Sequence, residues 1–476
     1  MTAAPDSLWE RFAVGRPGAA PVLGELGHDE ALAAVDEVAG HLVDAGVRAG
    51  ESVGLLGPND ARWVVRLLAL IRVGARPLLL PSDAPPPEVG RLLRAAGAGR
   101  HLDGGDGVPL GVPAASTGPP GVLLLATSGS TGAPKIVART QLSLLDEGRR
   151  YARAGLVRPD DRVLLPLPLS HAYALGWLAG AVLVGAQVLP ASPNALNTVQ
   201  RHVEQGATVL VSVPGLARVL VRRRSFADAP MPALRLVMCG AGFVDRELDA
   251  RWSERTGVGV SRNYGSSETG AVLWAPPGGP AGCVGRPMPG VDVRLATPDG
   301  GTLTGAGQGE VTVVLEDGRT HRMGDLAERD DAGDVTILGR SRTGVVRRGA
   351  RWVSTLEVES VLRSTPGVAD VAVVATGTPD SDDQGLTAHY VPAGRGPEAL
   401  ADLVAFARSS LAAYKVPEAF RPCYRLRRTG VGKLAAAPVY RPAGRGSGAE
   451  RAALAAAVVG LGLWPTLTHG ATAAQL

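Results

Sequence analysis

Short apolar runs alternate with amphipathic stretches over most of the chain. Runs bounded by glycine or proline have the length of buried strands: residues 53–56, 77–80, 122–126, 163–165, 208–213 and 234–238. Between these runs, apolar residues recur at helical spacing, as in residues 30–47 and 62–73. Buried strands that alternate with helices are typical of parallel sheets, because the crossover between two parallel strands usually carries a helix. The pattern therefore predicts an α/β fold with mainly parallel sheets.

The pattern changes after residue 340. Short β-like segments at 345–346 and 371–374 flank a helical stretch at 356–364. The last part opens Arg-Pro-Ala-Gly-Arg-Gly-Ser-Gly and continues alanine-rich, which is typical of a linker followed by a weak helix or disorder. Further upstream, residues 101–120 are rich in glycine and proline and predict a surface loop. The predicted organisation is a large N-terminal domain, a small α+β C-terminal domain and a linker or tail, over residues 1–340, 341–440 and 441–476.

Composition narrows the class of protein. The formal charge is +4, from 49 Lys plus Arg against 45 Asp plus Glu, and no long basic run favours nucleic acid as a partner. The three cysteines are far apart and lack metal-ligand spacing, which argues against a disulfide framework or a zinc site. The N-terminus lacks the order of a secretory signal, and no apolar stretch reaches the roughly 20 residues of a membrane span. We therefore expect a cytoplasmic enzyme.

Lysine is scarce in this chain. Only three of the cationic residues are lysines: Lys135, Lys415 and Lys433. Lysine offers a compact ammonium on a flexible stem where arginine offers a wide planar fork. The three lysines are therefore candidates for positions that require a point donor, although chance survival on the surface explains their number equally well.

A loop rich in hydroxyl groups and glycine directly follows the apolar run at 122–126. Its candidate phosphate-binding residues are Thr127, Ser128, Gly129, Ser130, Thr131, Gly132 and Lys135. Glycine lets the backbone approach an anion closely, hydroxyls and amides donate hydrogen bonds to phosphate oxygens, and lysine supplies charge. The spacing is not that of a P-loop NTPase, so that class is disfavoured. A flexible turn without a ligand is the alternative.

This segment resembles the phosphate loop of the ANL superfamily, which comprises acyl-CoA and aryl-CoA synthetases, nonribosomal-peptide adenylation domains and luciferases. Further segments resemble the family's motifs in the family's order: Asn263–Thr269, His321–Leu326, Gly339–Arg340, Trp352–Glu359, Tyr414–Pro417 and Thr429–Leu434. The resemblance covers roughly residues 20–440. It implies a large N-terminal domain of stacked, mainly parallel sheets and a small mobile C-terminal domain.

The resemblance implies catalysis by Lys433, His171 and Ser267. Lys433 would contact the α-phosphate and the attacking carboxylate, where its charge offsets the repulsion between two anions. Ser267 would reach the α-phosphate. Lys135 would act on the phosphates of the leaving pyrophosphate, and Glu268 would bind Mg²⁺, a hard cation that prefers oxygen ligands.

The remaining nucleotide contacts are implied in the same way. Asp325 would accept hydrogen bonds from the ribose hydroxyls, with Arg340 nearby. Tyr264 would stack on the adenine of ATP. The backbone of Gly240, Ala241 and Gly242 would lie against the base.

The segment at 166–173 is informative about the acid. Amino-acid-activating domains carry an Asp in a motif of this region that holds the substrate's ammonium, and this segment has none. The resemblance of His171 to the histidine of CoA ligases implies an acid without an α-amine. The candidate pocket-lining residues combine small and aromatic groups: His171, Tyr173, Ser212, Val213, Pro214, Gly240, Ala241 and Gly265. This mixture favours a compact aryl acid over a long chain.

The implied reaction makes an acyl-adenylate and then passes the acyl group to a phosphopantetheine thiol after a rotation of the C-terminal domain. CoA is the favoured acceptor, and a carrier protein is the alternative. Two departures concern the second step, because Arg342 stands at the hinge and Met323 replaces the threonine of the ribose motif. A catalytically impaired homologue that binds nucleotide or a partner also remains open, as does a homodimer.

Overall fold

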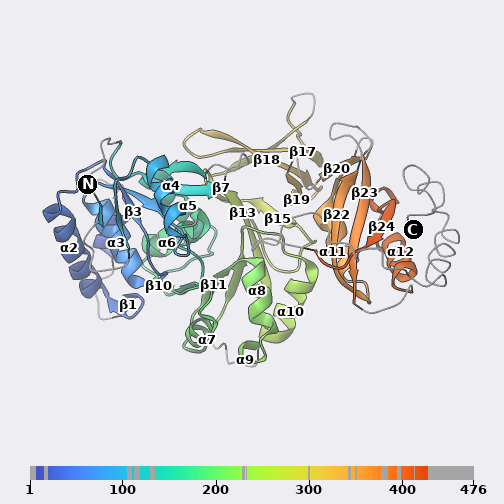
Figure 1. Cartoon of the computed structure of the whole chain (residues 1–476), viewed down its shortest axis with the longest axis horizontal. Coiled ribbons are helices and arrows are strands. Elements are labelled where there is room, and N and C mark those ends of the chain that lie inside the picture. The colour runs from blue at the N-terminus through green and yellow to red at the C-terminus, as the bar shows by residue number, and fades with distance from the viewer. Residues whose placement is uncertain are drawn as a thin grey trace. The chain divides into compact units, whose positions relative to one another are not determined.

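The computed structural model describes residues 7–15, 20–103, 110–111, 118–128, 134–227, 231, 233–297, 301–340, 345–348, 351–376, 384–393, 398–411 and 413–426. Contacts divide the chain into two compact units, and Figure 1 labels many of their elements. The first unit takes residues 1–279, 284–293 and 313–321. The second takes residues 280–283, 294–312 and 322–476. The predicted boundary at residue 340 stays a prediction.

The first sheet of the N-terminal unit has six strands in the order β6-β5-β3-β4-β7-β8. Their bounds are β3 (Ser52–Leu55), β4 (Arg76–Leu79), β5 (Arg100–Leu102), β6 (Leu110–Gly111), β7 (Leu123–Ser128) and β8 (Pro134–Arg139). The inner strands β5, β3, β4 and β7 are parallel, and both outer strands are antiparallel to their neighbours. The loop predicted for residues 101–120 is wrong at His101, which pairs with Gly54 of β3 and Leu110 of β6.

The second sheet is built on a parallel set in the order β10-β9-β11-β12-β13. Strand β1 continues the parallel set beside β10, while β2, β14 and β15 pair antiparallel. The bounds are β1 (Pro21–Leu23), β2 (Leu26–Gly27), β9 (Arg162–Leu165), β10 (Gln187–Pro190), β11 (Val209–Ser212), β12 (Leu236–Cys239), β13 (Val260–Ser266), β14 (Gly270–Ala275) and β15 (Cys283–Pro287).

Helices connect these strands. Their bounds are α1 (Leu8–Val14), α2 (His28–Asp44), α3 (Ala61–Arg72), α4 (Pro86–Ala95), α5 (Gln141–Arg153), α6 (Ala172–Val184), α7 (Leu196–Glu204), α8 (Pro214–Arg222), α9 (Arg224–Ala227) and α10 (Arg246–Thr256). Strands β3, β11 and β12 are buried at every residue. Their sequences are mostly apolar because helices or the other sheet cover both faces of each strand.

Alternate residues of the second sheet enter different cores. Val163, Val211 and Met238 point into the large core shared with the first sheet and helices α2, α3, α5 and α6. Leu210 and Val237 point into a second core with α7, α8 and α10. Side chains of a strand alternate between its two faces, so this one parallel sheet contributes side chains to both cores. The prediction of an α/β fold with stacked, mainly parallel sheets is confirmed.

The C-terminal unit is a smaller α+β structure. A hairpin of β20 (Val345–Arg348) and β21 (Arg351–Ser354) precedes α11 (Thr355–Arg363). A three-stranded sheet follows in the order β22-β23-β24. The bounds of the remaining elements are β22 (Val368–Thr376), β23 (Gly385–Pro392), α12 (Glu398–Ser410), the 3₁₀ helix Ala413–Lys415 and β24 (Ala419–Pro422). Three further strands have residues in both units: β16 (Asp292–Ala296), β17 (Gly307–Val314) and β18 (Thr320–Arg329). Strand β19 (Val335–Arg340) lies in the second unit.

Leu210 provides a test of the second core. Its side chain is fully buried, so Leu210→Ala should lower the free energy of unfolding by about 2–5 kcal/mol through lost burial and a residual cavity. Val219 on α8 is 46% exposed, and Val219→Ala should change it by less than about 0.5 kcal/mol. Denaturant unfolding followed by tryptophan fluorescence measures both. Equal effects would contradict this assignment of the core.

Candidate active site

The parallel register of β9, β11, β12 and β13 gathers their carboxyl ends at one edge of the sheet. In open α/β sheets, ligands bind outside these ends. Many of the predicted site residues lie on or just after them: His171, Tyr173, Ser212, Val213, Pro214, Gly240, Ala241, Gly242, Tyr264, Gly265, Ser267 and Glu268. Fold topology therefore collects residues that are up to about a hundred positions apart in the sequence.

His171 begins α6 as its N-cap. Its Nδ1 accepts the backbone N–H of Tyr173 at 3.4 Å, which satisfies one of the free donors of the first turn. Desolvation by the surrounding protein lowers the pKa of the imidazole, although the residue keeps solvent contact. The neutral form, which can accept this hydrogen bond, is therefore favoured at neutral pH.

Tyr173 lies against the backbone that follows β12. Its hydroxyl donates to the carbonyl of Met238 at 3.3 Å. A Cβ added to Gly240 would lie 2.6 Å from Cζ of the Tyr173 ring, so only glycine leaves room for the ring. Burial raises the pKa of the phenol well above its ordinary value, so the hydroxyl stays protonated and can keep donating.

Small residues form the wall beside this tyrosine. The N–H of Gly240 donates to the carbonyl of Ser212 at 3.2 Å, across the ends of β12 and β11. Pro214 occupies the first position of α8, and a Cβ on Gly242 would lie 3.1 Å from its Cδ. Ala241 has φ of +56°, the one positive φ of a non-glycine residue in the described part of the chain. Such a conformation costs about 1–3 kcal/mol and is often retained at functional sites.

The hairpin of β13 and β14 carries the next group of predicted residues. Tyr264 and Gly265 lie near the end of β13, and Ser267 and Glu268 lie in the turn. Inside the turn, the N–H of Ser266 donates to Oγ1 of Thr269 at 3.2 Å, and the N–H of Thr269 donates to Oγ of Ser266 at the same distance. These reciprocal bonds satisfy the turn's backbone and define its shape.

Lys135 and Glu268 form an ion pair 133 residues apart in the sequence. The Lys135 Nζ lies 3.0 Å from Oε1 of Glu268, and the side chains are 64% and 39% exposed. Burial raises the pKa of Glu268, but hydrogen bonds led by the one from Lys135 outweigh it and lower the pKa. An ionised, accessible carboxylate fits a cation such as Mg²⁺ that keeps several waters and phosphate oxygens as its other ligands.

Two predicted ribose-site residues belong to the second unit. Asp325 of β18 is the antiparallel partner of Arg340 of β19, and its side chain is buried. In the same unit Lys415 donates to both carboxylate oxygens of Glu357, at 2.7 and 2.9 Å. Lys415 therefore has a structural role in this unit.

Some of the predicted residues belong to segments outside the described ranges. Gly129, Ser130, Thr131, Gly132 and Lys433 lie outside the described residues, as does Arg342. Thr127, Ser128 and Arg340 are described by their backbone alone; Thr127 pairs with Lys135 across β7 and β8.

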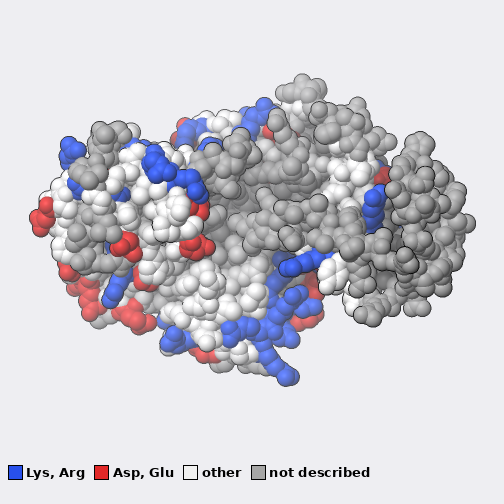
Figure 2. Space-filling view, in the orientation of Figure 1, with Lys and Arg blue, Asp and Glu red and all other residues white. Residues whose placement is uncertain are grey.

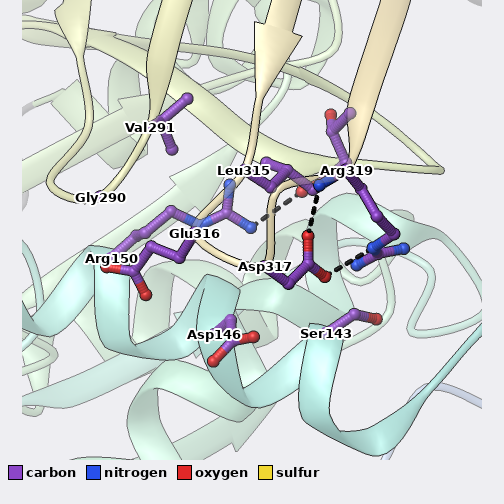
Figure 3. Close-up of a pocket in the computed structure, with 10 residues that line it drawn as sticks. Ser143, Asp146, Arg150, Gly290, Val291, Leu315, Glu316, Asp317 and Arg319 are labelled. Carbon is purple, nitrogen blue, oxygen red and sulfur yellow. Dashed lines mark hydrogen bonds and ion pairs between the residues drawn. The ribbon is translucent and has the colours of Figure 1, made fainter.

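A buried charged group that contacts the β13–β14 hairpin carries no motif in the sequence. Arg139 and Glu147 form an ion pair of 3.1 Å, with 3% and 1% of their side chains exposed. Arg150, also on α5, donates to the carbonyl of Thr269 at 2.8 Å. Figure 3 shows Ser143, Asp146 and Arg150 of α5 beside residues 315–319, where they line a cavity of about 10 Å³. That is room for about one water molecule.

Surface charge is mixed on the face that Figure 2 shows. Acidic side chains gather over α2: Asp29, Glu30, Asp36, Glu37 and Asp44. Arginines gather over α8 to α10, where Arg218 pairs with Asp245 at 2.7 Å and Arg251 with Glu247 at 2.6 Å. These pairs neutralise part of the positive charge of that face.

None of the helices in the described ranges is long and apolar enough to cross a bilayer. Within the same ranges, no three His, Cys, Asp or Glu side chains are grouped so that they could hold a metal ion.

Comparison with known families decides the class of enzyme. The AMP-binding enzyme family matches residues 10–109 and 120–314, and the AMP-binding enzyme C-terminal domain matches residues 357–433. The chain belongs to this family. The predictions of an ANL adenylate-forming enzyme and of an AMP-forming ligase are thereby confirmed, and the protein is an ATP-using enzyme.

Among known proteins, a feruloyl-CoA synthase of an Amycolatopsis species is 31% identical over 86% of this chain and 92% of its own length. A salicyl-AMP ligase / salicyl-S-ArCP synthetase of Mycobacterium tuberculosis is 26% identical over 92% of this chain and 89% of its own. The crystal structure of the anthranilate CoA ligase AuaEII in complex with anthranoyl-AMP has a TM-score of 0.76 and 21% identity, and covers 90% of this chain and 95% of the other. At this identity the structural likeness shows the fold.

Gly240 and Tyr173 provide a test of the site's packing. Gly240→Ala should lower the free energy of unfolding by about 1–3 kcal/mol, because the new methyl group forces the Tyr173 ring to move. In the Tyr173→Ala background the same change should cost much less. Denaturant unfolding of the four proteins in the cycle measures the coupling. Additive effects would contradict the contact.

Proposed function

We propose that the protein uses ATP and Mg²⁺ to convert an aryl carboxylic acid to its adenylate, and then transfers the acyl group to the thiol of CoA. The observation that carries this proposal is the contact of the Tyr173 ring with Gly240 at the strand-end edge that also carries Glu268. A flat aromatic wall and small residues suit a flat acid. The ion pair of Glu268 with Lys135 supplies charged groups of both signs for magnesium and phosphate.

The choice of an acid without an α-amine rests on the start of α6. Residues 166–173 contain no carboxylate, and His171 is held as a hydrogen-bond acceptor at the helix N-terminus. A buried ammonium group requires an anionic or polar partner, because burying a charge unpaired is costly. A pocket lined by residues 166–173, which offer no carboxylate, therefore favours benzoate-like or cinnamate-like acids over amino acids. The proposed lining residues are His171, Tyr173, Ser212, Val213, Pro214, Gly240, Ala241 and Gly265.

In the adenylation step the acid's carboxylate attacks the α-phosphorus of ATP, and pyrophosphate leaves. Lys433 and Ser267 would stabilise charge at the α-phosphate, and Lys135 would do so on the leaving phosphates. Glu268 would hold Mg²⁺, which neutralises phosphate charge when it is bound. Because two anions must meet, these groups act mainly by positioning and by electrostatic stabilisation.

The proposed nucleotide contacts are assigned residue by residue. Residues 127–132 and Lys135 would bind the phosphates. Tyr264 and the backbone of residues 240–242 would contact adenine. Asp325, beside Arg340 in the β18–β19 ladder, would accept hydrogen bonds from the ribose hydroxyls.

The acceptor is the second part of the proposal. The feruloyl-CoA synthase is the more identical of the two relatives, at 31%, and its name specifies a CoA product. The salicyl-AMP ligase, at 26% identity, is named for transfer to ArCP, so a carrier-protein thiol is the second candidate. The same acyl-adenylate serves both acceptors, and only the thiol differs.

Pyrophosphate release tests the reaction and the acid together. The enzyme with ATP and Mg²⁺ is given benzoates, cinnamates, fatty acids and amino acids, each with and without CoA. We expect release with aryl acids and formation of an aryl-CoA thioester. Lys433→Ala should lower the rate by about 10²–10³-fold, since a positioned charge at the reacting phosphate is lost. Release with amino acids alone would overturn the assignment of the acid.

Two further results of this assay separate the alternatives. Adenylate formation without thioester, relieved by a carrier-protein phosphopantetheine, would favour the second acceptor. No release with any acid, together with measurable ATP binding by calorimetry, would favour a catalytically impaired nucleotide-binding homologue.

Tyr173 should set the size of the acid. Tyr173→Ala removes the ring that fills the space at Gly240, so the ratio of kcat/KM for a larger cinnamate to that for benzoate should rise about tenfold or more. Tyr173→Phe keeps the ring and loses only the hydrogen bond to Met238, so it should keep the wild-type ratio. An unchanged ratio in Tyr173→Ala would exclude this residue from the pocket.

A further inference from the structure

Glu147 of α5 is a buried carboxylate that the proposed reaction does not use. Its Oε1 accepts the backbone N–H of Ala271, the second residue of β14, at 2.9 Å. Its Oε2 accepts from Nη1 and Nη2 of Arg139 at 3.1 and 3.2 Å. A buried carboxylate is tolerated only when it is paired in this way, so its position is tightly fixed.

Two glycines enclose this carboxylate. A Cβ added to Gly176 of α6 would lie 2.1 Å from Oε1 of Glu147, and one added to Gly270 would lie 2.2 Å from Oε2. Gly270 also has φ of +66°, a conformation that favours glycine. The helix on one side and the hairpin on the other are thus shaped to admit the carboxylate.

Helix α5 holds the hairpin at two further points. Arg150 donates to the carbonyl of Thr269 at 2.8 Å. The Tyr151 hydroxyl donates to Oδ1 of Asn263 at 3.2 Å. Together with the hydrogen bond from Ala271 to Glu147, these contacts fix the backbone on both sides of Gly270. They also fix β13, the strand that leads into the turn.

The same carboxylate also holds the strand that carries Lys135. Arg139 ends β8, four residues after Lys135, and its guanidinium also donates to Oγ and the carbonyl of Ser143 at 3.2 and 2.9 Å. Through Arg139 and Ala271, Glu147 therefore joins β8 to the hairpin by buried contacts. On the accessible side, Lys135 and Glu268 meet at 3.0 Å.

We propose that Glu147 is a positioning residue for adenylation, which fixes the turn with Ser267 and Glu268 relative to Lys135 on β8. The inference rests on the proposed function, because it assigns the geometry of the phosphate and magnesium contacts to a residue that touches neither. It separates a role in ATP use from general support of the fold by predicting which kinetic constant changes.

Glu147→Gln tests the proposal. Glutamine keeps the shape and can accept from Ala271, but its NH₂ group cannot accept from Arg139, so two donors face each other. We expect the KM for ATP to rise, kcat/KM for ATP to fall about 10–100-fold, and more Mg²⁺ to be required, because the turn moves relative to Lys135. The KM for the acid should change less than threefold or so, because the hydrogen bonds of Glu147 run to Arg139, Ala271 and Tyr151 rather than to Tyr173 or Gly240.

Asp249→Asn is the matched control. Asp249 of α10 is buried and accepts from the N–H groups of Val260 and Gly278 at 2.9 and 2.6 Å and from Arg262 at 3.0 Å. It therefore makes the same kind of contacts at the other end of the β13–β14 ladder. Asp249→Asn should lower the unfolding temperature as Glu147→Gln does, while the KM for ATP stays as in wild type. Equal changes in that KM would overturn the proposal.

The double variant Arg139→Met with Glu147→Gln distinguishes charge compensation from positioning. Removing both charges should recover much of the lost unfolding temperature, because no guanidinium is left buried without its partner. The KM for ATP should stay raised, because β8 and the hairpin are no longer joined. Full recovery of that KM would show that Glu147 only neutralises the buried charge of Arg139, and would overturn the positioning role.

Failure of the proposed function is visible separately. It would appear in the wild-type enzyme as no pyrophosphate release with any acid. In that case the Kd for ATP·Mg²⁺, measured by calorimetry in the wild type and both single variants, still tests the positioning role. A Kd raised only in Glu147→Gln would support it, and equal Kd values would overturn it.

Discussion

Burial of both faces of the parallel strands is the constraint on which the rest of this structure depends. Strands such as β11 and β12 have no exposed residue, so they cannot present chemistry along their length. Polar groups are placed where the strands end, because the backbone there leaves the sheet and can meet water or a ligand. The parallel register brings those ends together, which is how Ser212 and Gly240 become neighbours.

The same constraint explains how much of the fold could be predicted. The apolar runs that give β9, β11 and β12 are visible in the sequence because burial on both faces removes polar residues from them. The short outer pairing of β5 with β6 was missed, since His101 and Gly111 carry no strand signal and the pairing is made by backbone groups. Backbone hydrogen bonds need no particular side chain, so composition could not report them.

The candidate site divides in a similar way. The resemblance to family motifs named Lys135 and Glu268, and the structure brings these distant residues to 3.0 Å. It could not name Glu147 or Arg139, because their positions in α5 and β8 look like ordinary solvent-facing charges until the tertiary neighbours are known. The sequence also did not mark Gly176 and Gly270, the glycines that leave room for the carboxylate. A glycine that a neighbouring side chain requires looks like any other glycine in a sequence.

The described lysines show why a scarce residue type is an incomplete guide. Lys415 makes a bidentate pair with Glu357 and is only 20% exposed, so its ammonium is committed to the C-terminal unit. Lys135 approaches one carboxylate oxygen of Glu268, and both side chains are well exposed. An exposed ion pair contributes little to stability, so an incoming phosphate or cation can replace either partner at small cost. A weak pair is therefore the better candidate for a ligand site, because its charges are held in place and remain available.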